Sequence, residues 1–218
     1  MRAGARRLPA ALAIVLALVV ATGCASSGDG AADGSGGAAD ITTSGNDGFH
    51  GAVIQNPYDL PALAFTDTAG RPFVPAEDAR HAVTLVFFGY THCPDVCNVV
   101  LANVASALRR SDAAVRDRVQ LLFVTTDPDR DTPAVMRGYL DRFDPSYVGL
   151  TAPLPTIEKA ARSLGIAYTG KEGATAGGYE VGHGAQVIAF TGGKGRLVWM
   201  PETPVKDLRS DLARLARA

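Results

Sequence analysis

The sequence of 218 residues is poor in cysteine, with three in all, and contains a single tryptophan. Three cysteines cannot build the disulfide framework on which small secreted folds depend. A chain of this length does not need one, because it can bury a full hydrophobic core. The sequence also has no excess of basic residues, because it contains 21 Lys and Arg and 22 Asp and Glu. The composition therefore indicates no nucleic-acid partner, which would require a basic surface.

Long apolar runs are scarce as well, and the longest stands at the N-terminus. Arg2, Arg6 and Arg7 precede the apolar stretch 12–20, and Ala-Thr-Gly follows before Cys24. This order of charge, apolar run and small residues predicts a signal peptide over 1–23, too short for a stable membrane span. Its end resembles a bacterial lipobox, in which the cysteine is lipidated and becomes the first mature residue. We therefore expect a lipid anchor at Cys24 on the extracytoplasmic face of the cell membrane. The alternative is an ordinary signal peptide with Cys24 near its cleavage site.

Residues 25–47 consist of Gly, Ala, Ser and Asp with almost no large apolar side chain. Such a segment cannot bury enough surface to order itself, which predicts a flexible tether over 24–49. A single folded domain is expected over 50–218. Residues 24–218 carry 18 Lys and Arg against 22 Asp and Glu, a formal charge of −4.

The pattern of the folded part alternates strands and helices. Apolar runs at 81–89 and 119–126 are typical of strands buried on both faces. Helical spacing follows each run, with Thr132 as the N-cap of the second helix. The remaining expected elements are a hairpin over 62–73, a helix over 157–164, a hairpin over 185–199 and a helix over 205–216. This order predicts an α/β sandwich with a central mixed sheet, flanking helices and an N-terminal β-hairpin, and it matches the thioredoxin-like plan.

Cys93 and Cys97 follow the first buried strand, at the carboxyl end where open α/β sheets place their sites. With Cys93 at the start of a helix, Cys97 lies one turn later on the same face. The helix dipole then favours the Cys93 thiolate. The two cysteines could therefore act as a redox-active dithiol or bind a metal ion together. A structural disulfide is the third alternative, but a helical pair of this spacing is wider than an ideal disulfide.

A metal site needs a further ligand, and four histidines are available. His50 lies at the tether margin, His81 opens a strand, and His92 is expected to point away from the cysteines. His183 stands in a glycine-rich segment just before a strand that we expect to lie beside the cysteine-bearing strand. Two thiolates and one imidazole suit Cu(I), or Cu(II) with an added ligand, whereas structural zinc prefers four protein ligands.

Three motifs in this order resemble the Sco/SenC family: Gly89–Cys97 (GYTHCPDVC), Thr126–Pro133 (TDPDRDTP) and Gly182–Gly184 (GHG). The resemblance covers about residues 55–216. It implies a thioredoxin-fold copper-binding protein with Cys93, Cys97 and His183 as the copper ligands. It also implies a role in assembling cytochrome c oxidase, by delivering copper to the CuA site of subunit II or by reducing the cysteines of that site. Another copper protein is the alternative partner, and a monomer is expected.

Two positions depart from the family pattern, which often has Pro after the second cysteine and Asp before the histidine. Here those positions hold Asn98 and Gly182. Neither change removes a ligand, but Gly182 removes a carboxylate that could orient the imidazole. The five glycines between 169 and His183 indicate a mobile ligand. Asp127 is expected mainly to help shape a turn. In a minority hypothesis, Asp127 orders the cysteine loop or approaches the metal.

Two other functions remain open. The first is a thiol–disulfide oxidoreductase that uses Cys93 and Cys97, although CxxxC differs from the CxxC of thioredoxin-like redox motifs. The second is a peroxidase with Cys93 as the reactive thiol, for which the sequence offers no motif. Whether the protein is an enzyme stays undecided, and a metallochaperone is favoured.

Overall fold

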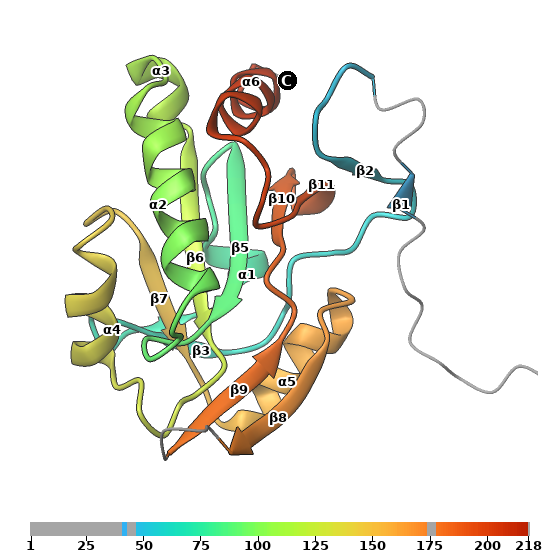
Figure 1. Ribbon diagram of the computed structural model, residues 1–218. Helices are drawn as coiled ribbons and strands as arrows, with labels where there is room; N and C mark the ends of the chain where they lie inside the picture. The colour runs from blue at the N-terminus through green and yellow to red at the C-terminus, as the bar shows by residue number, and fades with distance from the viewer. Residues whose placement is uncertain (1–40, 43–46, 174–177, 218) are drawn as a thin grey trace, which may run out of the picture. The chain divides into compact units, whose positions relative to one another are not determined.

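The computed structural model describes residues 41–42, 47–173 and 178–217 (Figure 1). Cys24, the predicted signal peptide 1–23 and most of the predicted tether 24–49 lie outside these residues. Within the described part of the chain, no helix is both long and apolar enough to span a bilayer.

Eleven strands and six helices make up the described residues. The strands are β1 (Ile41–Thr42), β2 (Ala52–Ile54), β3 (Phe65–Asp67), β4 (Pro72–Phe73), β5 (Val83–Gly89), β6 (Val119–Thr125), β7 (Val148–Thr151), β8 (Tyr168–Gly173), β9 (Tyr179–His183), β10 (Val187–Thr191) and β11 (Lys194–Trp199). The helices are α1 (Pro75–Asp78), α2 (Val96–Arg109), α3 (Ala113–Arg116), α4 (Pro133–Leu140), α5 (Leu154–Ser163) and α6 (Val205–Leu215). Nine strands form one sheet in the order β1-β2-β11-β10-β5-β6-β7-β3-β4, and β8 pairs with β9 alone.

The centre of the sheet is the parallel pair β5 and β6, in which every residue is buried. Successive side chains point to opposite faces of a strand. Leu85 and Phe87 accordingly pack under α2, α4 and α6, whereas Val86 and Phe88 pack against α5 (Figure 1). The two apolar runs thus form a sheet with a core on each face. The predicted thioredoxin-like sandwich with a mixed central sheet is confirmed.

Both predicted hairpins are present. β3 pairs antiparallel with β4 around Gly70, whose φ of +77° is a left-handed value that favours glycine. β10 pairs with β11 around Gly192 and Gly193, with φ of +56° and +76°. β10 also pairs with β5, so the expected neighbour of the cysteine-bearing strand is confirmed.

Several elements differ from the expectations. α5 begins at Leu154, ahead of the expected start at 157, because Pro155 suits a first helical turn. β1 falls within the predicted tether and pairs with β2. The hairpin β8–β9 was not predicted, because its glycine-rich sequence lacks the β-branched pattern of a strand.

A buried carboxylate attaches the start of the domain to α6. Asp211 is fully buried and accepts hydrogen bonds from the backbone N–H of His50 (3.0 Å) and Gly51 (2.8 Å). It also accepts from Trp199 Nε1 (2.8 Å). Three donors on one buried carboxylate stabilise its charge. His50 therefore belongs to this anchor and lies far in the fold from the cysteines.

Candidate metal centre

The cysteine turn follows the carboxyl end of β5, where Cys93 precedes α2 and Cys97 is the second residue of the helix. The expectation that Cys93 opens the helix is wrong, because Pro94 disfavours helical backbone at the residue before it. The Cys97 N–H instead donates to Cys93 Sγ at 3.4 Å. The first amides of a helix lack partners within it, so the Cys93 sulfur caps α2.

The two cysteines are free thiols and are electrostatically unlike. A hydrogen bond from the Cys97 thiol lowers the pKa of Cys93 to about 6, against the opposing effect of burial. The same hydrogen bond, together with burial, raises the pKa of Cys97. At neutral pH the pair therefore holds one proton, on Cys97, and Cys93 is the thiolate.

His183 is the last residue of β9, on the hairpin β8–β9, and not in a free loop as expected. Its Nδ1 lies 3.0 Å from the Gly184 carbonyl oxygen. A carbonyl only accepts, so Nδ1 carries the proton and Nε2 keeps a free lone pair. Burial lowers the pKa of His183, which keeps the ring neutral. The Tyr90 ring packs against the imidazole edge at 5.8 Å between centroids.

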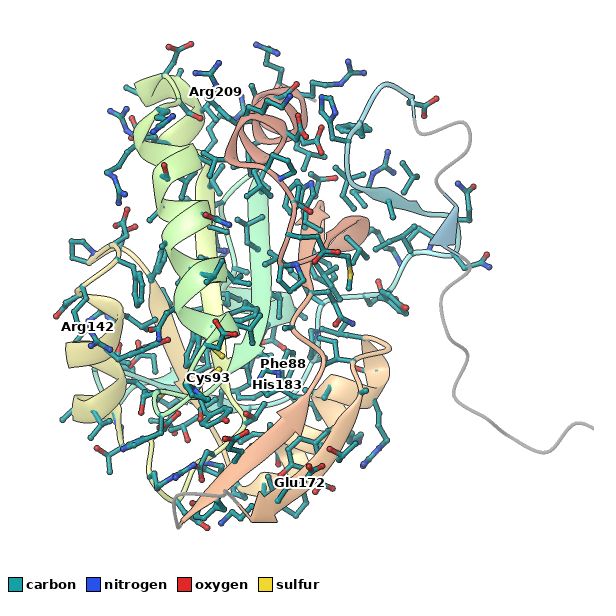
Figure 2. The ribbon with its side chains drawn as sticks, viewed as in Figure 1. Phe88, Cys93, Arg142, Glu172, His183 and Arg209 are labelled. Atoms are coloured by element: carbon teal, nitrogen blue, oxygen red, sulfur yellow. The ribbon has the colours of Figure 1, made fainter. Side chains whose placement is uncertain are left out.

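The hairpin brings the histidine to the cysteines, and Cys93 and His183 lie close together in Figure 2. Cys97 Sγ lies 3.9 Å from His183 Nε2. An ion bound to both atoms would have bonds of about 2.3 Å to the sulfur and about 2.0 Å to the nitrogen. With a trigonal angle between the two bonds, the sulfur and the nitrogen would lie about 3.7 Å apart, close to the observed separation. Among the described residues, no three His, Cys, Asp or Glu side chains already form a closed metal cluster. Cys97 and His183 therefore lie at a separation that one ion can span, and Cys93 lies beside Cys97, whose N–H donates to the Cys93 sulfur.

A hollow of about 260 Å³ opens onto this group. Tyr90, Cys93 and His183 line it, and Asp95 and Glu180 supply carboxylates at its rim. Cys93 is 7% exposed and Cys97 is fully buried, so a partner in this hollow meets Cys93 first.

Asp131 orders the cysteine turn, and the sequence interpretation missed it. Its fully buried carboxylate accepts from the Thr91 N–H (3.0 Å), the Thr91 hydroxyl (2.6 Å) and the Thr125 hydroxyl (2.7 Å). Asp131 is the third aspartate of the DPDRDTP motif, which was the available signal in the sequence. The spacing of the motif alone does not show that this aspartate reaches the turn after β5.

Asp127 is buried but does not hold the cysteine turn, so that part of the minority hypothesis is wrong. Its carboxylate accepts from the Tyr179 hydroxyl at 2.8 Å and pairs with Arg130. The Arg130 guanidinium in turn lies 3.7 Å from the centre of the Tyr179 ring. Asp127 thus attaches the hairpin that carries His183 to the loop that carries Asp131.

The two departures from the family pattern have local explanations. The Asn98 amide donates to the Cys93 carbonyl oxygen (3.5 Å) and accepts from the Tyr139 hydroxyl (3.1 Å), linking the cysteine turn to α4. A Cβ on Gly182 would lie 1.9 Å from Thr169 Oγ1, so a side chain there requires Thr169 to move. Glu172 Oε1 lies 3.0 Å from the same point and accepts from Thr169.

His92 is exposed, as expected, and its Nδ1 lies 3.0 Å from the Thr91 hydroxyl and 3.9 Å from Asp131. His81 is exposed at the start of the β5 region. Neither residue approaches the cysteine sulfurs.

The alkylation rate of Cys93 should rise with pH around a midpoint of about 6, because the thiolate is the nucleophile. Cys97→Ala removes the donated hydrogen bond and should move the midpoint upward. Cys97→Ser keeps a hydroxyl donor and should move it less. Iodoacetamide rates on the metal-free, reduced protein from about pH 5 to about pH 9 measure this. A wild-type midpoint in the ordinary thiol range would contradict the proton assignment.

Comparison with known proteins gives a consistent set of relatives. The SCO1/SenC family profile matches residues 54–217. A putative copper-binding protein of Stutzerimonas stutzeri is 30% identical over 147 residues, which is 67% of this chain and 71% of the relative. In the mitochondrial protein SCO2 of Saccharomyces cerevisiae the match spans 39% of the relative's own length.

Solved structures agree with this result. Apo Sco1 from Thermus thermophilus aligns with a TM-score of 0.68 and 31% identity, over 77% of this chain and 96% of that one. Copper-bound ScoI from Bradyrhizobium japonicum aligns with a TM-score of 0.60 and 31% identity, over 73% and 98%. The aligned region is nearly the whole of both solved chains, so those two domains fold without further segments.

Proposed function

Because the chain belongs to the SCO1/SenC family, we propose that its folded domain binds copper through Cys93, Cys97 and His183 and delivers it to the CuA site of cytochrome c oxidase subunit II. The observation that carries this proposal is the 3.9 Å separation of Cys97 Sγ and His183 Nε2 beside the Cys93 thiolate. Support also comes from the copper-bound ScoI relative at 31% identity.

The donor set explains the choice of metal and its release. Thiolate ligands select soft Cu(I), and the neutral imidazole adds a third donor without charge. Three protein ligands leave one side of the ion open toward the hollow beside Cys93. An acceptor thiolate in this hollow can replace the protein ligands one at a time, so copper passes by ligand exchange and is never free.

The proposal includes a location. Lipidation of Cys24 after removal of residues 1–23 would anchor the chain on the extracytoplasmic face of the cell membrane. Residues 24–40 would then serve as the tether of a monomeric domain. The supporting observation is the sequence order of basic residues, apolar run and small residues before Cys24.

One observation favours a second candidate, reduction of a partner disulfide. The Cys93 thiolate would attack one partner sulfur and release the other as a thiolate. Cys97, after losing its proton, would then attack Cys93, releasing the partner dithiol and leaving a Cys93–Cys97 disulfide. The low pKa of Cys93 suits the first step. His183 has no part in either step.

His183→Ala separates the two functions when the domain of residues 48–218 meets a soluble copper-free CuA domain. With a reduced acceptor, the copper-loaded wild type should transfer copper, measured as the copper content of the acceptor after the two proteins are separated, and His183→Ala should not. With a disulfide-bonded acceptor and no metal, thiol release is measured instead. Rapid thiol release by both proteins, without copper transfer by the wild type, would overturn the chaperone proposal in favour of the reductase.

A further inference from the structure

Four arginines surround a hollow of about 500 Å³ between the end of α2, α3 and α6. Arg110, Arg209, Arg214 and Arg217 line it, with Asp112 as the one acidic residue. Residues 41–218 carry 18 Lys and Arg against 19 Asp and Glu, so the domain as a whole is not basic. Four of these 18 basic side chains nevertheless line this one hollow.

The four arginines differ in their contacts inside the domain. Arg214 donates to the Asp47 carbonyl oxygen and lies over the Phe49 ring. The side chains of Arg110, Arg209 and Arg217 are exposed, and no ion pair or hydrogen bond joins them to another described residue. Arg110 and Arg217 follow helix C-termini, where a positive charge complements the dipole. Arg209 lies in the middle of α6, so the dipole does not explain it.

The hollow lies at the end of the domain away from the metal centre (Figure 2). β5 runs from Val83 toward the cysteine turn, and the 14 residues of α2 run back over about 21 Å to Arg110. The opposite end carries Asp95 and Glu180 at the rim of the metal-site hollow. The arginine hollow and the two carboxylates beside the metal-site hollow therefore lie at opposite ends of the domain.

The first residues of the continuous described segment lie beside this hollow. The Arg214 guanidinium donates to the Asp47 carbonyl oxygen and lies over the Phe49 ring.

We propose that the arginine hollow docks onto the anionic phospholipid headgroups of the membrane to which the chain is tethered, and so directs the metal centre away from the bilayer. Guanidinium groups bind phosphate oxygens with two parallel hydrogen bonds. An anionic surface attracts the arginines and repels the acidic rim of the metal site. Docking itself requires only the folded domain, so its failure is separable from that of the copper proposal.

Sedimentation of residues 41–218 with sucrose-loaded vesicles tests this surface at millimolar lipid and low ionic strength. One vesicle type contains phosphatidylcholine alone, and the other includes about 30% phosphatidylglycerol. The wild type should bind only the anionic vesicles and should be released at about 0.5 M salt. Arg110→Gln/Arg209→Gln should weaken binding about 30-fold, as expected for the loss of two basic side chains near such a surface.

The matched control is Lys159→Gln/Arg162→Gln, which removes two exposed charges from α5 on the other face of the sheet. It should bind as the wild type does, and thermal unfolding verifies that both variants are folded. Equal weakening in the two variants, or equal binding to both vesicle types, would overturn the proposal. Binding of inorganic phosphate without preference for anionic vesicles would also overturn it, and would assign the hollow to a free anion.

Discussion

The wild-type domain of residues 48–218 should retain about one copper per chain after desalting against a Cu(I) chelator, and His183→Ala should retain far less. The mutation removes the one donor that is not a thiolate, and Nε2 lies 3.9 Å from Cys97 Sγ with its lone pair free. Changes in residues that only support a ligand cost about 10- to 100-fold in metal affinity, so loss of the ligand itself should cost about 100-fold or more. Cys93→Ser and Cys97→Ser should each abolish retention. Metal analysis of reduced, anaerobic protein measures the result.

His92→Ala is the matched control, because His92 is one residue from Cys93 but points to Thr91 and Asp131. It should retain copper as the wild type does. If His183→Ala retained copper fully and His92→Ala lost it, the ligand assignment would be wrong. If no variant bound copper, the wild type included, the dithiol would be a redox pair and not a copper site.

Asp131→Ala should both destabilise the domain and weaken copper binding. The mutation leaves the Thr91 N–H and the Thr125 hydroxyl without their acceptor in a buried place. Loss of a buried, charged acceptor of this kind should lower the free energy of unfolding by about 3 kcal/mol. The turn that carries Cys93 then loses its attachment to the β6–α4 loop, and Cu(I) affinity should fall about tenfold or more. Urea unfolding and chelator competition measure the two effects.

Asp129→Ala is the control for the same loop. Asp129 is 73% exposed at its side chain and pairs only with Lys171, so its loss should change stability by less than about 1 kcal/mol. Asp131→Asn keeps the shape and one acceptor oxygen, and it should fall between wild type and Asp131→Ala. The Asp131→Ala protein could be folded and destabilised and yet bind copper with the affinity of the wild type. That result would show that Asp131 supports the fold and does not position the thiolate.

The β6–α4 loop joins the two halves of the metal centre. Asp131 holds the turn of Cys93, and Asp127 with Arg130 holds Tyr179 on the hairpin that ends at His183. The cysteines and the histidine come from separate segments, so a common support is needed to keep their separation constant. Thr132 and Pro133 of the same motif form the start of α4 beyond it.

Local sequence was enough to predict the central strands, the turns and the cysteine pair. The runs that became β5 and β6 are apolar at most positions, with Thr84, Gln120 and Thr125 as the polar residues, and such runs are typical of strands buried on both faces. Gly70, Gly192 and Gly193 have left-handed backbone, which glycine adopts without steric cost. The spacing of Cys93 and Cys97 depends on a single turn of chain. In each case the cause lies within a few residues.

The remaining features depend on pairing between distant segments, which residue periodicity does not encode. His183 reaches Cys97 across 86 positions because β10 pairs with β5 and a separate hairpin folds back over the strand ends. Asp131 and Asp127 are alike in sequence, and only packing sends one to the cysteine turn and the other to the hairpin. The arginines of α2 and α6 line one hollow because those helices pack side by side over the same face of the sheet.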